Sequence, residues 1–420
     1  MTAEEITRKR AQILSASTFA LLFMGLVYAF SLFTAPLSST FGLNESNVSL
    51  TFNIMIITSS LGGLVGSFLQ SRIGLRGELS IAAILSFLGF AGTGTFGSAG
   101  LLAVYLLYGV CGGLGAGIAY NGIVANTNIW FPDKVGFSSG ILMMGYGMSA
   151  LLLGNLSVVL IGAIGFSPSF VLLGVAVFTI TVGTSFVITR PPADLNEKMP
   201  SAQSTDVSSR IEDPVKPPQT LVFWLYWIWV IFVSAIGLAT IGSAASDAQL
   251  AGFDSGQAAL VVGAISVCNG LSRIISGNVY DRKGIVFAML SGSLFALAST
   301  VLILLGLTLP ASPLYLAGVV CCGLCYGSCP VISSAFARQR YGFKNYAFNL
   351  SVVNFSPILA SLLNIAVGMS VASSSRISMF IVMGILSLIT LCDLAPFAHC
   401  WKRDIHKLMR KKEQTTLHAT

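Results

Sequence analysis

Charged side chains are scarce in this sequence. Of its 420 residues only 9% are Asp, Glu, Lys or Arg, whereas about 25% are charged in an ordinary soluble domain. Hydrophobic residues make up 54% of the chain, and its mean hydropathy is +0.82. So few polar side chains cannot cover a water-facing surface, which excludes a soluble enzyme and a disordered chain. The composition indicates a protein that crosses the membrane several times.

The residue groups that enzymes and metal sites require are also missing from the sequence. All three histidines lie in the C-terminal stretch, and no loop holds a nucleophile–base set or a metal or nucleotide motif. Four of the eight cysteines cluster in one apolar run, at Cys321, Cys322, Cys325 and Cys329. A metal site is conceivable there, but we interpret the cluster as a small apolar helix face. We therefore predict no enzymatic activity, no metal ion and no cofactor.

Twelve apolar runs of about 20 residues follow one another along the chain, each long enough to cross a bilayer as a helix. Charged or turn-forming loops separate them, as at 72–78 and 281–284. The stretch at 190–219 is polar, rich in Pro and Ser, and typical of a linker. We predict an N-terminal six-helix half at 1–189, a cytoplasmic linker at 190–219, a C-terminal six-helix half at 220–398 and a basic cytoplasmic tail at 399–420.

The basic residues predict how the chain is oriented. If both termini are cytoplasmic, the termini and the even-numbered loops hold 21 of the 23 Lys and Arg residues. Only Arg376 lies in an outer loop, and only Arg273 lies within a span. Because cytoplasmic loops are enriched in Lys and Arg, we expect a multi-pass protein of a bacterial inner membrane, with the eukaryotic plasma membrane as the alternative. Basic residues placed in this way do not indicate a nucleic-acid partner.

Two charged loops recur at a fixed spacing. The segment 71–74 (Ser-Arg-Ile-Gly) matches 281–284 (Asp-Arg-Lys-Gly) at an offset of 210 residues, and Lys134 matches Lys344 at the same offset. This offset is half of the chain length, as expected for two copies of one six-span unit. The predicted fold is therefore an all-α membrane protein with twelve transmembrane helices in two pseudo-symmetric six-helix halves.

The loop at 277–284, Gly-Asn-Val-Tyr-Asp-Arg-Lys-Gly, resembles the G-x-x-x-D-R-x-G loop of the major facilitator superfamily. The resemblance implies that fold, with two halves that rock around a central substrate site. It also implies gating contacts at cytoplasmic helix ends from Asp281, Arg282 and, in the first half, Arg72. There Ser71 stands where an acid is usual, which is expected to weaken the latch on that side.

Further motifs resemble the oxalate:formate antiporter family, which belongs to the monocarboxylate-porter branch of the superfamily. They include 126–134 (Asn-Thr-Asn-Ile-Trp-Phe-Pro-Asp-Lys) and 269–273 (Asn-Gly-Leu-Ser-Arg). The resemblance covers most of the chain and implies transport of small carboxylates. Four tyrosines align with cavity tyrosines of the family, and three asparagines are further binding candidates: Tyr28, Tyr120, Tyr146, Tyr326, Asn269, Asn349 and Asn354. Aromatic packing between helices is the alternative role of the tyrosines.

Arg273 is the most distinctive single residue. It lies eight residues before Asp281, so it sits more than two helical turns inside the membrane. A charge at that depth is costly and normally faces a partner or a polar cavity, yet its own span has no carboxylate within a turn or two. A guanidinium can hold a carboxylate through two hydrogen bonds, and in the family the arginine at this position binds substrate. A buried ion pair is the alternative.

The number of cations in the cavity bears on the substrate. In the oxalate:formate antiporter, the resemblance implies a second cation, a lysine, at the position of Val353. One guanidinium neutralises one carboxylate well and two poorly. We therefore expect a secondary transporter of a small monocarboxylate such as formate, acetate, lactate or pyruvate. The alternatives are an oxalate:formate-type exchanger of dicarboxylates and a membrane carboxylate sensor that does not transport.

Acidic residues that could carry a coupling proton are few. Proton-linked monocarboxylate carriers often have an acid one turn before the span-eight arginine, where this chain has Asn269. Asp247, near the outer end of span seven, is the coupling candidate, with a loop cap as its alternative role. Asp393 is interpreted as a helix-end charge, and we expect no acid in the middle of a span. Proton symport, exchange and uniport all stay open, and we expect a monomer in the lipid bilayer.

Overall fold

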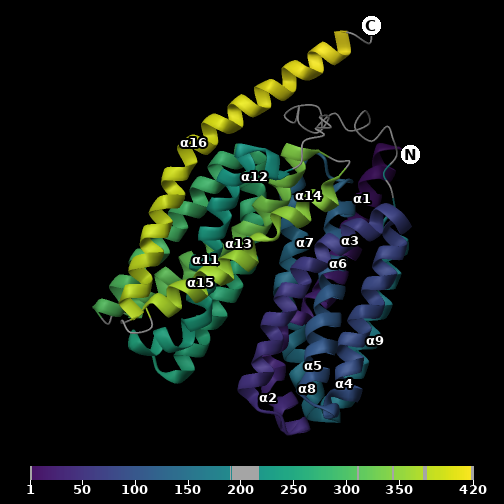
Figure 1. Ribbon diagram of the computed structural model, residues 1–420, viewed down its shortest axis with the longest axis vertical. Coiled ribbons are helices and arrows are strands. Elements are labelled where there is room, and N and C mark those ends of the chain that lie inside the picture. Colours follow the sequence, from purple (N-terminus) through teal and green to yellow (C-terminus); the bar gives the residue numbers. More distant parts are fainter. Residues whose placement is uncertain are drawn as a thin grey trace. The chain divides into compact units, whose positions relative to one another are not determined.

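The computed structural model describes residues 2–189, 191, 217–309, 312–342, 345–371 and 376–417. Nearly all of these residues are helical, and no strand occurs among them (Figure 1). Ten described helices are long and apolar enough to cross a membrane. Two of them, Leu50–Ala99 and Gly263–Thr308, are broken at glycines with left-handed backbone angles, Gly74 (φ 73°) and Gly284 (φ 78°). Divided there, the helices account for the twelve predicted spans, and the predicted all-α membrane fold is confirmed.

The chain forms two compact units. The first contains 1–132, 141–203 and 350–352, and the second contains 133–140, 204–349 and 353–420. The start of one helix of the first half, 133–140, thus groups with the second unit. Most of the predicted linker at 190–219 lies outside the described residues, so the predicted domain boundaries stay a prediction.

The first unit is built from helices that are interrupted in several places. The short breaks are the 3-10 turns η1 (Gly25–Ala29) and η3 (Gly97–Ala99) and the π-helical turns η2 (Leu88–Gly92), η4 (Tyr105–Gly112) and η5 (Ala150–Gly154). The helices are α1 (Ala3–Met24), α2 (Phe30–Phe41), α3 (Glu45–Phe87), α4 (Thr93–Phe96), α5 (Leu101–Val104), α6 (Gly113–Asn128), α7 (Val135–Ser149), α8 (Asn155–Ile164) and α9 (Phe166–Val187).

The second unit has longer uninterrupted helices. After the 3-10 turn η8 (Pro217–Gln219), they are α11 (Leu221–Leu250), α12 (Ser255–Thr308), α13 (Ser312–Tyr341), α14 (Tyr346–Val353), α15 (Ser356–Val371) and α16 (Arg376–Leu417). α13 packs along α12, and α11 contacts α12, α13, α15 and α16. This unit therefore surrounds the predicted arginine on α12 with several helices.

The backbone repeats itself at the offset found in the sequence. α3 begins at Glu45 and α12 begins at Ser255, which is 210 residues later. The left-handed glycines that precede and divide these helices keep the same spacing, since Gly42 corresponds to Gly252 and Gly74 to Gly284. A left-handed φ suits glycine because it has no Cβ atom. The two units thus place their chain turns at equivalent positions.

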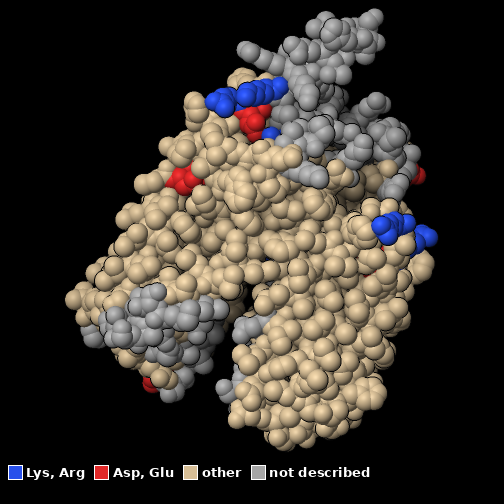
Figure 2. Space-filling model, in the orientation of Figure 1, with Lys and Arg blue, Asp and Glu red and all other residues tan. Residues whose placement is uncertain are grey.

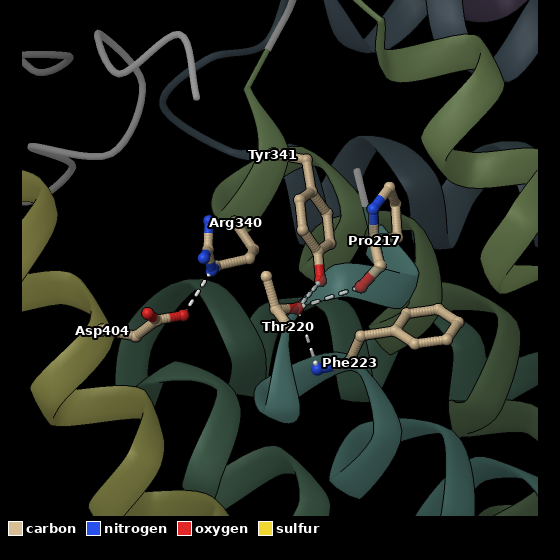
Figure 3. Close-up of polar contacts among 6 residues, drawn as sticks. All are labelled: Pro217, Thr220, Phe223, Arg340, Tyr341 and Asp404. Atoms are coloured by element: carbon tan, nitrogen blue, oxygen red, sulfur yellow. Dashed lines mark hydrogen bonds and ion pairs between the residues drawn. The ribbon is translucent and has the colours of Figure 1, made fainter. Parts of the chain in front are cut away.

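Polar contacts join three helices at one end of the second unit (Figure 3). The Thr220 side chain accepts a hydrogen bond from the Phe223 amide (3.3 Å) and also bonds the Tyr341 hydroxyl (2.7 Å). Beside it, Arg340 Nε donates to Asp404 Oδ2 at 2.7 Å. These contacts fix the start of α11, the end of α13 and the late part of α16 to one another, at the end that the basic residues assign to the cytoplasm.

Charge is confined to a small part of the visible surface. On the face in Figure 2, Lys and Arg side chains lie only near the upper ends of the helices, and the flanks show none among the described residues. Large apolar side chains such as Phe68, Leu102 and Leu260 are more than half exposed. An exposed apolar belt of this kind is suited to lipid.

Candidate functional site

Close packing of α12 and α13 positions the predicted site of the second unit. A Cβ atom on Gly323 of α13 would lie 2.7 Å from Cys268 Cβ and 2.8 Å from the Ile265 carbonyl oxygen of α12. One turn later, a Cβ on Gly327 would lie 2.8 Å from Ser272 Cβ. The two glycines therefore let the helix backbones approach closely, as small residues four apart do in membrane helices.

Arg273 emerges from this tightly packed helix pair. Its side chain is half-buried. One turn before it, the Asn269 side chain is also half-buried, and its buried Oδ1 atom has no hydrogen-bond partner among the described residues. The structure thus places a cation and an amide on consecutive turns of α12, within one polar region.

Tyr326 adds an aromatic side chain from α13. A Cβ on Gly237 of α11 would lie 2.5 Å from Tyr326 Cδ2 and 2.6 Å from its Cβ, so this glycine makes room for the tyrosine. Tyr326 is half-buried and directly precedes Gly327, which contacts the Asn269 backbone. Arg273, Asn269 and Tyr326 therefore come from one neighbourhood of the second unit.

The position of the absent second cation lies at a helix break. α14 ends at Val353 and α15 begins at Ser356, and the Trp227 indole N–H of α11 donates to the Val353 carbonyl at 3.2 Å. Val353 is fully buried. Asn354 lies half-buried in the turn between the two helices, and Asn349 is buried one turn earlier on α14. The break presents two amide side chains and no charge.

The first unit holds the other predicted tyrosines. The rings of Tyr120 on α6 and Tyr146 on α7 lie 5.1 Å apart at 56°. Next to them, the Asn121 amide donates to the Gly63 carbonyl of α3 at 3.2 Å. Tyr28 lies in η1, where the buried Tyr108 hydroxyl donates to the carbonyls of Leu26 (3.4 Å) and Val27 (3.3 Å); the Tyr28 side chain lies outside the described part of the structure.

Asp281 binds the N-terminus of α7 within the second unit. Its carboxylate accepts hydrogen bonds from the amides of Gly136 (2.8 Å) and Phe137 (2.7 Å). These amides belong to the first helical turn, which has no partners of its own and carries partial positive charge. Arg282 is exposed, as is Arg72, whose guanidinium lies over the Phe68 ring at 4.2 Å. Of the three predicted gating residues, Asp281 is the one whose side chain these hydrogen bonds connect to another helix.

Asp247, the predicted coupling residue, is fully buried on α11. The Ser243 hydroxyl, one turn earlier, donates to Asp247 Oδ2 at 2.5 Å. The cysteines at 322, 325 and 329 are buried on α13, and the thiols of Cys325 and Cys329 donate to carbonyls of their own helix. No group of three metal-binding side chains occurs in the ranges that the structure describes.

Two buried carboxylates escaped the sequence analysis. Glu78, expected in a loop, is fully buried on α3 in the turn that follows the Gly74 break. Asp393, interpreted as a helix-end charge, lies inside the continuous helix α16 and is only 8% exposed. Glu78 stands in a charged segment with Arg72 and Arg76, so composition alone assigned it to a loop. Gly66 and Gly122 face Glu78, and this pairing becomes visible only in the tertiary structure.

Comparisons with known proteins agree with this architecture. The model of the Major Facilitator Superfamily matches residues 15–363. The chain belongs to this superfamily. This membership confirms the predicted family and confirms that the chain is a membrane transporter and not an enzyme.

Individual members of the superfamily resemble the chain at low sequence identity. An uncharacterized MFS-type transporter of Escherichia coli (strain K12) is 25% identical over 84% of this chain and 86% of its own length. The oxalate:formate antiporter of Oxalobacter formigenes is 26% identical over 62% of this chain and 60% of its own length. Among solved structures, the proton:xylose symporter XylE has a TM-score of 0.68 at 15% identity, covering 94% of this chain and 96% of that one. This last likeness concerns the fold alone.

Proposed function

We propose that the protein is a secondary transporter of small organic monocarboxylates that works by alternating access, with Arg273 binding the carboxylate. The observation that carries the proposal is the half-buried guanidinium on α12 with the Asn269 amide one turn away and Tyr326 on the adjoining helix. A guanidinium and neutral hydrogen-bonding groups together suit a carboxylate. The similarity to an oxalate:formate antiporter supports the same class of substrate.

A monoanion fits the charges of this region better than a dianion. Val353 is apolar and buried, and the turn that follows it adds only an asparagine. Arg338 and Arg340, the buried cations on α13, belong to a different level, because Gln339 between them accepts a hydrogen bond from Tyr280 at 2.5 Å. Tyr280 is seven residues beyond Arg273, which corresponds to about 10 Å along a helix. Of these cations, Arg273 is thus the one that lies at the same depth along α12 as Asn269.

The proposed setting is a bacterial inner membrane, with a monomeric protein and both termini in the cytoplasm. The basic residues of the loops and termini support this orientation. The predicted contacts from Asn349 and Asn354 of the second unit would orient the bound carboxylate by hydrogen bonds, and those from Tyr120 and Tyr146 of the first unit stay a prediction. Their removal should weaken binding less than removal of the single cation.

The test is ligand binding and flux with paired arginine variants. Purified protein is screened by thermal shift against formate, acetate, lactate, pyruvate and oxalate, and uptake is measured in proteoliposomes. A bound ligand at about 100 times its Kd stabilises the folded state by about 2.7 kcal/mol. We expect monocarboxylates to raise the melting temperature, Arg273→Ala to abolish both shift and uptake, and Arg273→Lys to retain part of the shift. Lys283→Ala, at an exposed cation on the same helix that is given no gating role, is the matched control.

The alternatives give different outcomes in the same experiment. A larger shift with oxalate than with any monocarboxylate would favour a dicarboxylate exchanger. Binding that depends on Arg273 without any flux would favour a membrane sensor. Normal uptake by Arg273→Ala would show that the carboxylate is anchored elsewhere.

A further inference from the structure

Glu78 is a buried acidic residue that takes no part in the proposed substrate site. Its side chain has no solvent exposure, and neither carboxylate oxygen has a hydrogen-bond partner among the described residues. It lies four residues after Gly74, the glycine that divides α3. The carboxylate is therefore enclosed by protein only about one helical turn from the loop.

Two glycines form the walls around this carboxylate. A Cβ on Gly66, earlier on α3, would lie 2.8 Å from Glu78 Oε1. A Cβ on Gly122 of α6 would lie 2.7 Å from Oε1 and 2.9 Å from Oε2. Any larger residue at either position would displace the carboxylate. Because Gly66 and Gly122 have no side chains, the two helices leave room for the Glu78 carboxylate and enclose it.

Among the described residues, the helices that pack most extensively against α3 present no positive charge to Glu78. On α3 itself, Arg72 and Arg76 are exposed and lie over the rings of Phe68 (4.2 Å) and Phe186 (5.4 Å). α2, α5, α9 and η2 carry no titratable residue, and the only one on α6 is Tyr120, whose ring pairs with Tyr146. Tyr105, Tyr108 and Cys111 of η4 lie at least eleven residues before Gly122, or about 16 Å along the helix.

We infer that Glu78 is a proton-binding site of the transporter, which holds a proton when enclosed and releases it when the start of this span opens to water. This inference rests on the proposed transport function. An enclosed carboxylate without a cation or donor is strongly disfavoured in its ionised form, whereas the neutral acid is tolerated. Contact with water reverses that preference. One proton carried with one monoanion would make transport electroneutral.

Glu78 suits this role better than Asp247. The Oδ2 atom of Asp247 already accepts a hydrogen bond from Ser243 at 2.5 Å, whereas neither oxygen of Glu78 has such a partner among the described residues. The equivalent of Glu78 in the second unit, 210 residues later, is the buried Ala288. The carboxylate thus belongs to one half only, as expected for a functional residue that the shared fold does not require.

The first arm of the test detects the proton directly and needs no substrate. Infrared spectra of the purified full chain at pH 7 should show a protonated-carboxyl band that loses intensity in Glu78→Gln and keeps it in Asp247→Asn; Asp393→Asn identifies the share of the second buried carboxylate. Absence of such a band from the unmodified protein would overturn the inference, and so would a band of unchanged intensity in Glu78→Gln.

The second arm measures coupling in proteoliposomes with labelled formate, acetate, lactate and pyruvate. A pH difference of one unit should drive accumulation by about tenfold for one coupled proton. We expect Glu78→Gln to lose this accumulation and keep counterflow, since glutamine imitates the protonated acid, while Asp247→Asn keeps both. Protein-free liposomes correct for passive entry of the neutral acids. Full accumulation by Glu78→Gln would overturn the inference, whereas failure of all four substrates would overturn the proposed function and leave the infrared result to decide on Glu78.

Discussion

At the scale of single residues, glycines decide which side chains can reach the site. Gly323 allows α13 to lie against α12 beside Asn269, and Gly237 makes room for Tyr326. We expect Gly323→Ala to destabilise the protein by about 1–3 kcal/mol, because its new methyl group would meet the Ile265 carbonyl of the neighbouring helix. Thermal unfolding in detergent measures the change. Gly263→Ala on α12, where the added Cβ meets nothing within 4 Å, is the matched control and should melt at or above the unmodified temperature. Equal melting of both variants would contradict the packing argument.

At single residues, the sequence points to a candidate where its chemistry is unusual for its surroundings. Arg273 could be proposed as a site residue because a guanidinium within an apolar run has few structural uses, and its role stays a prediction. Glu78 could not, because it follows Arg72 and Arg76 and the sequence does not show which side chain of a charged segment turns inward. Its burial depends on the approach of α6 at Gly122, which is a tertiary contact between residues 44 positions apart.

At the scale of helices, Asp281 is the clearest link between two elements. Its two carboxylate oxygens receive the amides of Gly136 and Phe137 at the start of α7. Hydrogen bonds to a charged acceptor contribute about 1.5–3 kcal/mol. We expect Asp281→Ala to lower stability by that order and to alter the transport rate, and Asp281→Asn to have a smaller effect because one acceptor oxygen remains. Melting temperature and initial uptake rate measure this series. Lys283→Ala, at an exposed neighbouring position, should change neither, and an Asn variant as damaged as the Ala variant would show that charge alone matters.

Helix boundaries were harder to predict than helix number. The lengths of the apolar runs predict twelve spans, but they do not predict the 3-10 turn at Gly25–Ala29 or the interruption between Val353 and Ser356. Both breaks are held by side chains from other helices, Tyr108 and Trp227, which bond the freed carbonyls. A single-sequence pattern does not contain these partners, so the breaks follow only from the tertiary structure.

At the scale of the whole molecule, the repeat explains the fold, and its departures from symmetry point to function. Gly113 and Gly117 of α6 pack against α3 at the positions that Gly323 and Gly327 of α13 occupy against α12. The equivalent of Arg273 in the first unit is Gly63, which packs beside Asn121. Glu78 likewise has an alanine as its counterpart. Each half therefore keeps the shared helix packing and carries buried ionisable residues that the other half lacks, among them Glu78 in the first half and Asp247 in the second.

The orientation in the membrane is a property of the whole chain and can be tested at two exposed positions. The bias of Lys and Arg predicts that Arg282 lies on the cytoplasmic side and the Gly252 turn on the outer side, one span away. In a variant with the eight native cysteines replaced, a cysteine at Arg282 should react with a membrane-impermeant thiol reagent only in inside-out vesicles. A cysteine at the neighbouring exposed Leu250 should react only in right-side-out vesicles. The reverse pattern would place Arg72, Arg282 and both termini outside the cell, and the proton released by Glu78 would then leave to the opposite compartment.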